Sequence, residues 1–308
     1  PGADIGIHRA WAFYGQIPDR RPVTVAMIDT GVDVNHPELT GSIWINEDEI
    51  PGDGIDNDDN GYVDDINGWD FYADSGCVFS GDEDEHGTHG AGTIAAAWDG
   101  QGTAGIADSR YVKVMVLKVL GTKDGKGVSS AVKRAISYAQ DNGAQICNLS
   151  MGTTTYDKEL EEIIRSSPML FVVSAGNGDA AGQGYSIDDL PMYPAAYGAE
   201  NIISVGSMLF DGSMDISSNY GSASVDLVAP GISILSPVPG GYAFMSGTSM
   251  AAPMVTGTAA LVYSCRTDLD VMGVKQAILN SARPAESMAG RTVTQGVLDA
   301  YGAITYGK

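Results

Sequence analysis

Hydrophobic positions along the chain form short runs that alternate with segments of helical spacing. Residues 23–28 (VTVAMI) form a short apolar run typical of a strand buried within a parallel sheet. Further strands are predicted at residues 111–119, 144–150, 170–175, 202–205 and 225–229. Helices are predicted at residues 86–98, 129–142, 157–166, 249–264 and 269–282.

The order of these elements predicts the fold class. Within residues 129–142, Val132, Ala135, Ile136 and Ala139 repeat at helical spacing, and Ser129 is a candidate N-cap. Strand and helix alternate along the chain, which predicts an α/β fold with a mostly parallel central sheet and helices on both faces. No internal repeat or linker-like segment is apparent. Residues 1–308 are therefore expected to form one domain, with a polar, acidic loop inserted at residues 46–85.

Composition narrows the possible partners. The chain has 308 residues, 44% of them hydrophobic, and a net charge of −22. A surface with this much negative charge repels nucleic acid and anionic membranes. Neither is therefore expected as a partner. The longest apolar stretch, residues 251–263, is interrupted by Pro253, Thr256 and Thr258 and is shorter than the ~18 residues of a transmembrane helix. Because the chain begins at Pro1, we expect a processed or truncated form.

Cysteine usage indicates neither a metal site nor a compartment. The three cysteines are Cys77, Cys147 and Cys265, an odd number, so at least one is unpaired within the chain. Cys147 lies in an apolar strand pattern and is expected to be a small buried core residue. No Cys or His spacing suggests zinc.

Three polar residues fall at predicted strand-to-loop or loop-to-helix junctions. In parallel α/β sheets, functional residues usually lie in the loops at the carboxyl ends of the strands. Asp29 follows the strand at residues 23–28, where a carboxylate is costly unless it is hydrogen-bonded or functional. His86 and Ser249 each open a predicted helix. A serine hydroxyl needs a base, histidine is a base near neutral pH, and aspartate orients the imidazole. Together they form a candidate catalytic triad, although each alone would more simply be a turn or cap residue.

Longer segments carry a resemblance to a known family. The segments AMIDTGVDVNHPEL, HGTHGAGTIAA and GTSMAAPMVTG are similar, in this order, to the three active-site signatures of subtilases. The blocks KVLGTKDGKG, ICNLSMG, VVSAGNG and LVAPG also resemble their subtilase counterparts, so the similarity covers about residues 11–303. The resemblance implies a subtilisin-like serine endopeptidase made with an N-terminal prodomain, and a secreted or cell-surface location.

The resemblance also assigns roles to residues outside the triad. An oxyanion hole needs two donors, and the N–H of Ser249 at a helix start is one candidate. Asn177, within SAGNG, matches the family's oxyanion asparagine and would supply the other. His89 matches a second, non-catalytic histidine. His36 is expected to be structural, and His8 is expected at the surface.

A substrate cleft is implied as well. Subtilases bind an extended peptide as an added strand between two edge segments. The matching segments here are Ser150, Met151 and Gly152 on one side, and Gly125 and Gly127 on the other. Tyr193–Pro194 resembles the family's Tyr-Pro beside the primary specificity pocket, which implies a cis peptide bond. Met192 is expected to make that pocket shallow and apolar.

The acidic insertion contains a candidate calcium loop. Residues 53–65 (DGIDNDDNGYVDD) match the first half of an EF-hand loop, but the twelfth position is Asn67 rather than Glu. The candidate ligands of a structural Ca²⁺ are Asp56, Asp58, Asn60, Tyr62, Asp64 and Asp65. The alternative is a turn-rich acidic surface loop. The family's second calcium site, after the histidine helix, is not expected, because residues 98–103 are short and lack its Asn pattern.

Several functions and one specificity hypothesis remain open at this stage. A calcium-stabilised endopeptidase is the leading hypothesis, followed by a dedicated precursor-processing protease and an inactive subtilase-like binding protein. Asp84 matches an acidic position of kexin-like proteases. The match predicts a preference for Lys or Arg at the substrate position one residue before the residue whose carboxyl side is cleaved. The alternative is a solvated acidic turn. The acids at residues 82–85 would raise the pKa of His86, whereas a helix N-terminus would lower it.

Overall fold

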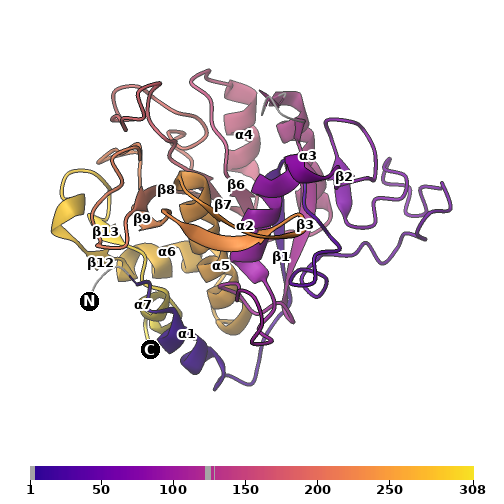
Figure 1. Cartoon of the computed structure of the whole chain (residues 1–308), viewed down its shortest axis with the longest axis horizontal. Helices are drawn as coiled ribbons and strands as arrows, with labels where there is room; N and C mark the ends of the chain where they lie inside the picture. The colour runs from indigo at the N-terminus through magenta and orange to yellow at the C-terminus, as the bar shows by residue number, and fades with distance from the viewer. Residues whose placement is uncertain (1–3, 122–125, 128) are drawn as a thin grey trace.

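The computed structural model describes residues 4–121, 126–127 and 129–308 (Figure 1). Its centre is a nine-stranded sheet with the strand order β12-β13-β9-β8-β7-β6-β1-β3-β2. All of its pairings are parallel except that of β12 with β13. The strands are β1 (Val23–Asp29), β2 (Gly68–Asp70), β3 (Val112–Lys118), β6 (Ile146–Leu149), β7 (Leu170–Ser174), β8 (Ile202–Met208), β9 (Leu227–Pro230), β12 (Arg283–Pro284) and β13 (Gly296–Val297).

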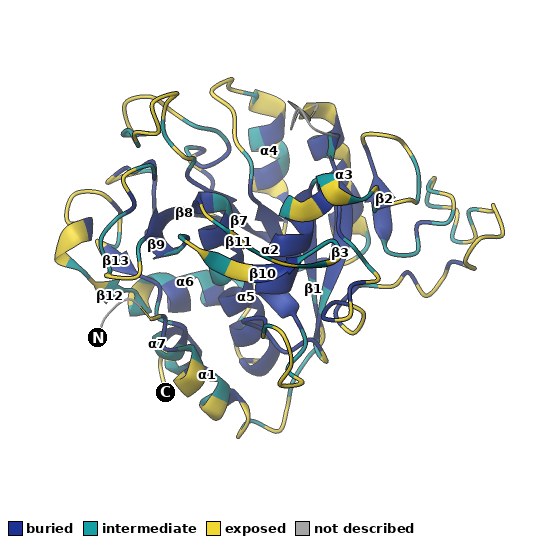
Figure 2. Ribbon diagram, in the orientation of Figure 1, coloured by how far each residue is buried: buried dark blue, intermediate teal, exposed yellow. Residues whose placement is uncertain are grey.

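Helices cover both faces of the sheet, as predicted. They are α1 (Ile7–Tyr14), α2 (Glu85–Ala95), α3 (Ser129–Asp141), α4 (Lys158–Ser166), α5 (Thr248–Cys265), α6 (Val271–Ser281) and α7 (Ala300–Thr305). Successive side chains of a strand point to opposite faces. Val25 and Met27 of β1 accordingly join a core with α1, α2, α5, α6 and α7, whereas Ala26 and Ile28 join another with α3 and α4. Figure 2 shows α5 dark blue through most of its length.

Some boundaries differ from the sequence-based expectation. The α2 helix ends at Ala95, before Trp98. The α4 helix begins at Lys158, because Asp157 is its N-cap and accepts from the Leu160 N–H at 3.1 Å. Ser129 is the first residue of α3 rather than its cap, and its hydroxyl donates to the Asp157 carboxylate.

Several short elements were not predicted. They are α1, α7, the one-turn helices η1 (Asp82–Asp84) and η2 (Glu286–Met288), the strands β2, β12 and β13, the hairpin of β10 (Ile234–Val238) with β11 (Gly241–Met245), and the pair of β4 (Leu120–Gly121) with β5 (Lys126–Gly127). Most are too short to leave a periodic pattern in the sequence. None of the helices in the described ranges is long and apolar enough to cross a bilayer.

The inserted segment at residues 46–85 extends from one edge of the sheet, at the right of Figure 1, and contributes the edge strand β2. The free thiol of Cys77 in this segment is exposed. Cys147 in β6 is buried, as predicted, and burial raises the pKa of its thiol. Cys265 at the end of α5 is also buried, and all three cysteines are free.

Candidate active site

Asp29 and His86 meet at the carboxyl edge of the sheet. Asp29 is the last residue of β1 and is 1% exposed, and His86 is the second residue of α2. The imidazole Nδ1 lies 2.7 Å from Asp29 Oδ1, and the same oxygen accepts from the Thr30 N–H at 2.7 Å. Two hydrogen bonds to one buried carboxylate oxygen fix both the carboxylate and the imidazole ring.

The charge of Asp29 governs the titration of His86. The carboxylate raises the pKa of His86, first through its charge and also through the hydrogen bond, while burial acts in the opposite direction and Glu85 adds a smaller upward contribution. The sequence left open whether the pKa of His86 would rise or fall. It rises chiefly because of Asp29, and the acidic run contributes less, through Glu85.

Ser249 lies in the first turn of α5, whose N-cap is Gly247 at φ 141°, a conformation that favours glycine. The Ser249 hydroxyl donates to the main-chain carbonyl of Ser150 at 3.2 Å. In return, the Ser150 hydroxyl donates to the main-chain carbonyl of Ser249 at 3.2 Å. These reciprocal bonds fasten the start of α5 to the segment that follows β6.

Asn177 follows β7 and borders the same helix start. Its side-chain oxygen accepts from the main-chain N–H and the hydroxyl of Thr248, at 2.8 and 2.9 Å. A Cβ on Gly247 would lie 3.1–3.4 Å from the Nδ2, Oδ1 and Cγ atoms of Asn177, so the amide group packs against the backbone just before Ser249. The ends of β1 and β7 and the starts of α2 and α5 therefore bring the four predicted residues to one edge of the sheet.

A cleft of about 1070 Å³ opens beside His86. Ser150, Met151 and Gly152 line one part of it, together with Tyr193 and Pro194. Gly127 pairs with Leu120, another lining residue, in the β4–β5 hairpin, whereas Gly125 lies outside the described residues.

Tyr193 lines the cleft, and Met192 packs beside the glycines of two neighbouring segments. The Tyr193–Pro194 peptide bond is cis, as predicted. A Cβ on Gly152 would lie 3.1 Å from Met192 Cγ and Sδ, and one on Gly176 would lie 3.5 Å from Met192 Cε. The thioether side chain therefore fills the space between the cleft segment and the loop that carries Asn177.

The hypothesis that Asp84 selects a basic substrate residue needs its carboxylate in the cleft, and the structure does not place it there. Its side chain is buried, and its carboxylate is paired with the ammonium group of Lys118, which is 2% exposed. The acids that line the cleft beside His86 are Asp82, Glu83 and Glu85. In sequence, a run of four acids is expected to be solvated throughout. Lys118 lies 34 positions after Asp84, so the sequence does not indicate that the two residues form a buried ion pair.

The other histidines make main-chain contacts. His89 is buried, and its Nε2 lies 2.8 Å from the carbonyl oxygen of Ile234. His36 is also buried, and its Nε2 lies 3.0 Å from the carbonyl oxygen of Gly241. Both rings thus hold the β10–β11 hairpin, and His8 is exposed.

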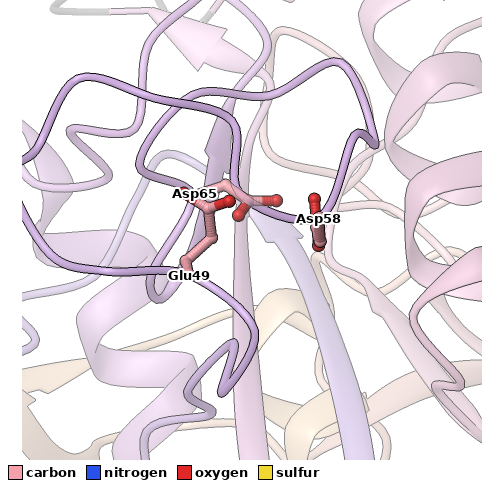
Figure 3. Close-up of side chains that lie close together, drawn as sticks. All are labelled: Glu49, Asp58 and Asp65. Atoms are coloured by element: carbon pink, nitrogen blue, oxygen red, sulfur yellow. The ribbon is translucent and has the colours of Figure 1, made fainter.

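The acidic insertion brings three carboxylates together. One ligand oxygen each from Glu49, Asp58 and Asp65 lies within 4.8 Å of the others (Figure 3). The amides of Asn46 and Asn60 both donate to Asp58 and to Asp65, at 2.8–3.0 Å. Tyr138 of α3 donates to Asp65 Oδ2 at 2.6 Å and anchors the loop to the body of the protein.

The other predicted ligands do not join this cluster. Asp56 accepts from the N–H groups of Asn60 and Gly61, and Asp64 accepts from those of Gly52 and Gly54, so both carboxylates close local turns instead. The ring of Tyr62 packs against Trp69, Phe71 and Tyr138. Glu49 and Asn46 precede the EF-hand-like spacing, so that motif gave no indication of them.

Comparison with known proteins finds one matching family model and several relatives with similar sequences. The family model described as "Subtilase family" matches residues 20–303. The "Thermophilic serine proteinase" of Bacillus sp. (strain AK1) is 35% identical over 92% of this chain, which spans 61% of that relative's length. "Thermitase" of Thermoactinomyces vulgaris is 33% identical over 92% of this chain and 88% of its own length. The "Major intracellular serine protease" of Bacillus subtilis (strain 168) is 36% identical over 79% of this chain and 68% of its own.

Two solved structures share the fold. The prenylagaramide maturation protease PagA matches with a TM-score of 0.73 and 27% identity, over 97% of both chains. The protease domain of PatA, as a mutant, matches with a TM-score of 0.71 and 27% identity, over 94% of this chain and 97% of the other. With the family model spanning nearly all of the sheet, and with relatives that are serine proteases, this chain belongs to the subtilase family of serine endopeptidases.

Proposed function

We propose that this chain hydrolyses peptide bonds with Ser249 as nucleophile, His86 as general base and Asp29 as the orienting carboxylate. The observation that carries the proposal is the 2.7 Å contact between His86 Nδ1 and the buried Asp29 carboxylate, at the edge of a cleft. That contact directs the Nδ1 proton to Asp29 and leaves Nε2 free to accept one.

The proposed reaction proceeds in two stages. His86 Nε2 takes the proton of the Ser249 hydroxyl, and the oxygen attacks the substrate carbonyl carbon. The N–H of Ser249 and the amide of Asn177 donate to the oxyanion that forms. The imidazolium then protonates the departing amine. Water, deprotonated by the same imidazole, attacks the acyl-enzyme and releases the acid product with Ser249 restored.

The Ser249 hydroxyl must rotate for this reaction. In the structure it donates to the Ser150 carbonyl oxygen and not to His86. A change of side-chain rotamer redirects it, and catalytic hydrogen bonds often form only when substrate is bound. The substrate would lie as an extended strand along Ser150–Gly152, where main-chain groups supply sequence-tolerant affinity.

The test combines activity with active-site labelling. Ser249→Ala should abolish peptide hydrolysis and labelling by a serine-directed phosphonate while leaving the thermal midpoint near that of the wild type. Ser137→Ala, on the outer face of α3, is the matched control and should keep both. Turnover by Ser249→Ala would refute the nucleophile assignment. A folded wild type that neither cleaves nor labels would favour an inactive binding protein.

A dedicated precursor-processing protease is the second candidate. It is favoured by the similarity over 97% of both chains to PagA, which is a maturation protease by name. A peptide-library cleavage profile separates the two, with Lys, Ala and Glu varied near the cleaved bond because four carboxylates line the cleft. Cleavage confined to one sequence would favour processing, and broad cleavage would favour a general endopeptidase.

We further propose that the acidic loop binds a structural Ca²⁺ through Glu49, Asp58 and Asp65. The donor set fits a hard cation, because three carboxylate oxygens converge and two Asn amides lie beside them. Rotating either amide by a half turn would present its oxygen in place of its nitrogen. Bound there, the cation would offset the repulsion among the carboxylates and link the loop to α3 through Asp65.

The remaining expectations are about the protein's context. The prodomain, the single-domain organisation and the secreted or cell-surface location stay predictions. The relatives include a protein described as intracellular, so family membership does not decide the location.

A further inference from the structure

A buried pair of opposite charges lies beside the Asp29–His86 contact. Lys118 is the last residue of β3 and is 2% exposed, and Asp84 is fully buried just before α2. The Lys118 ammonium group donates to Asp84 Oδ1, and it also lies 3.2 Å from Ser80 Oγ. Removing two charges from water is costly, so a pair retained in such a place calls for an explanation beyond stability.

The pair is linked to both ends of the proposed base. Lys118 is the direct register partner of Asp29 across β1 and β3, and the Val119 N–H donates to the Asp29 carbonyl at 2.9 Å. Asp84 stands two residues before His86, and its carbonyl accepts from the Thr88 hydroxyl at 2.8 Å. One salt bridge therefore connects the strand next to Asp29 with the first turn of the helix that carries His86.

Close packing fixes the carboxylate of Asp84. Its Oδ2 accepts from the Ser80 N–H at 2.6 Å. A Cβ added to Gly31 would lie 2.8 Å from Asp84 Cγ, so the chain just after Asp29 passes directly against this carboxylate. The Gly87 N–H, beside His86, donates to the Thr30 hydroxyl at 3.0 Å. Displacing Asp84 would thus disturb the turns on both sides of the Asp29–His86 contact.

We propose that Asp84 and Lys118 are positioning residues that hold the first turn of α2, and with it His86, in place against Asp29. The inference rests on the proposed function of His86 and Asp29. It assigns the pair no contact with substrate, and it predicts a mainly orientational effect on turnover. A misplacement of about 1 Å in a catalytic group can cost roughly 10²-fold in rate.

The pair also balances charge around His86. Among the described residues, the other ionisable groups around this region are Asp29 of β1, Glu85 and His89 of α2, Asp82 in the cleft wall, and Glu83, 3.8 Å from the Lys118 ammonium group. Asp70, at the end of β2, is the register partner of Lys118. Asp84 and Lys118 add one negative and one positive charge whose effects on the imidazole oppose each other. Removing either charge alone should therefore shift the pKa of His86, in opposite directions.

The decisive variant removes both charges while keeping shape. Asp84→Asn with Lys118→Met should remain folded, because Asn keeps an oxygen for the Ser80 N–H and no unpaired charge is left buried. We expect kcat to fall by roughly 10-fold to 100-fold with KM within about twofold of the wild type. The matched control, Lys158→Met with Glu162→Gln, removes an exposed pair on α4 and should leave kcat unchanged. A folded double variant with wild-type kcat overturns the proposal.

The single variants supply a readout that does not depend on turnover. NMR titration of the His86 ring should give a lower pKa in Asp84→Asn, where Lys118 is left unbalanced, and a higher one in Lys118→Met. If the double variant does not fold, Asp84→Asn alone decides, and an unchanged His86 pKa and kcat overturn the proposal. Failure of the proposed function itself is distinct, because it would appear as wild-type protein that neither cleaves peptides nor labels at Ser249.

Discussion

The side-chain oxygen of Asn177 accepts two hydrogen bonds from Thr248, one from its main-chain N–H and one from its hydroxyl. Two hydrogen bonds to the oxygen fix the orientation of the amide group, which packs against Gly247, two residues before Ser249. The proposed oxyanion donor is thus oriented before substrate arrives, which is the condition under which such a donor is most effective.

Asn177→Ala should therefore reduce kcat by about 10²–10³-fold with little change in KM, because the interaction forms fully only in the transition state. That range was measured in subtilisin, a member of this family, and is carried over here. Steady-state kinetics on a peptide substrate measures both constants. If KM instead rose by as large a factor as kcat fell, Asn177 would be supporting substrate binding as well.

The raised pKa of His86 sets the pH dependence of activity. Only the neutral imidazole acts as a base, so activity should fall as pH decreases through the raised pKa. Asp29→Asn removes the main cause of that shift, so its acid limb should move to lower pH while kcat drops by about 10⁴-fold. A pH–rate profile of both proteins tests this. An acid limb at the same pH in both would contradict the assignment of Asp29.

The contribution of His86 to folding stability should decrease as pH rises, whereas the activity should increase. A histidine whose pKa is raised by folding contributes stability that is fully present below its unfolded value of ~6.5. The contribution is lost as pH rises through the folded pKa of His86. Chemical denaturation of the wild type and of His86→Ala from pH 5 to pH 8 should show their difference shrinking as pH increases. A difference that grows with pH would contradict the pairing.

The calcium site predicts a chelator-sensitive thermal midpoint. A ligand that binds only the folded state stabilises it by mass action, roughly 2.7 kcal/mol at a free concentration 100 times Kd. Glu49→Gln should weaken this response to Ca²⁺. Asp59→Asn, an exposed substitution in the same loop outside the cluster, should keep it. A wild-type midpoint that is the same in EDTA and in Ca²⁺ would exclude the site.

Met192 predicts the size of the primary specificity pocket. Its side chain fills the space between Gly152 and Gly176, so Met192→Ala should deepen the pocket. We expect kcat/KM for Phe relative to Ala at the substrate residue before the cleaved bond to rise by about tenfold or more. An unchanged ratio would show that Met192 does not limit the pocket.

Residues with local signals were predictable, and residues defined by distant partners were not. Asp29 ends an apolar run, and His86 and Ser249 open helices within distinctive motifs, so sequence alone indicated these positions. The burial of Asp84 depends on Lys118, and the carboxylate cluster depends on Glu49, which precedes the recognisable spacing. Such contacts are created by the fold and leave no periodic pattern along the chain.

The β10–β11 hairpin was missed for a different reason. In β11 burial alternates between half-buried and exposed, but the residues after Gly241 are all apolar, so the sequence shows no alternation of apolar and polar positions. Pro237 lies within β10, and a proline usually argues against a strand unless the strand is at an edge. The two strands form a separate two-stranded sheet held by His36 and His89, so their position depends on residues far away in sequence.

The position of β1 in the sheet has a consequence for how the protein matures. Its neighbours are β3 and β6, so Val23 must find Val112, and Val25 must find Ile146, before Asp29 has a fixed place. Closing such long loops makes parallel sheets slow to assemble. A nascent chain therefore lacks the proposed site until β1 has paired with both neighbours and α5, which carries Ser249, has been synthesised. If the proposed function holds, peptide hydrolysis starts only after most of the sheet has assembled.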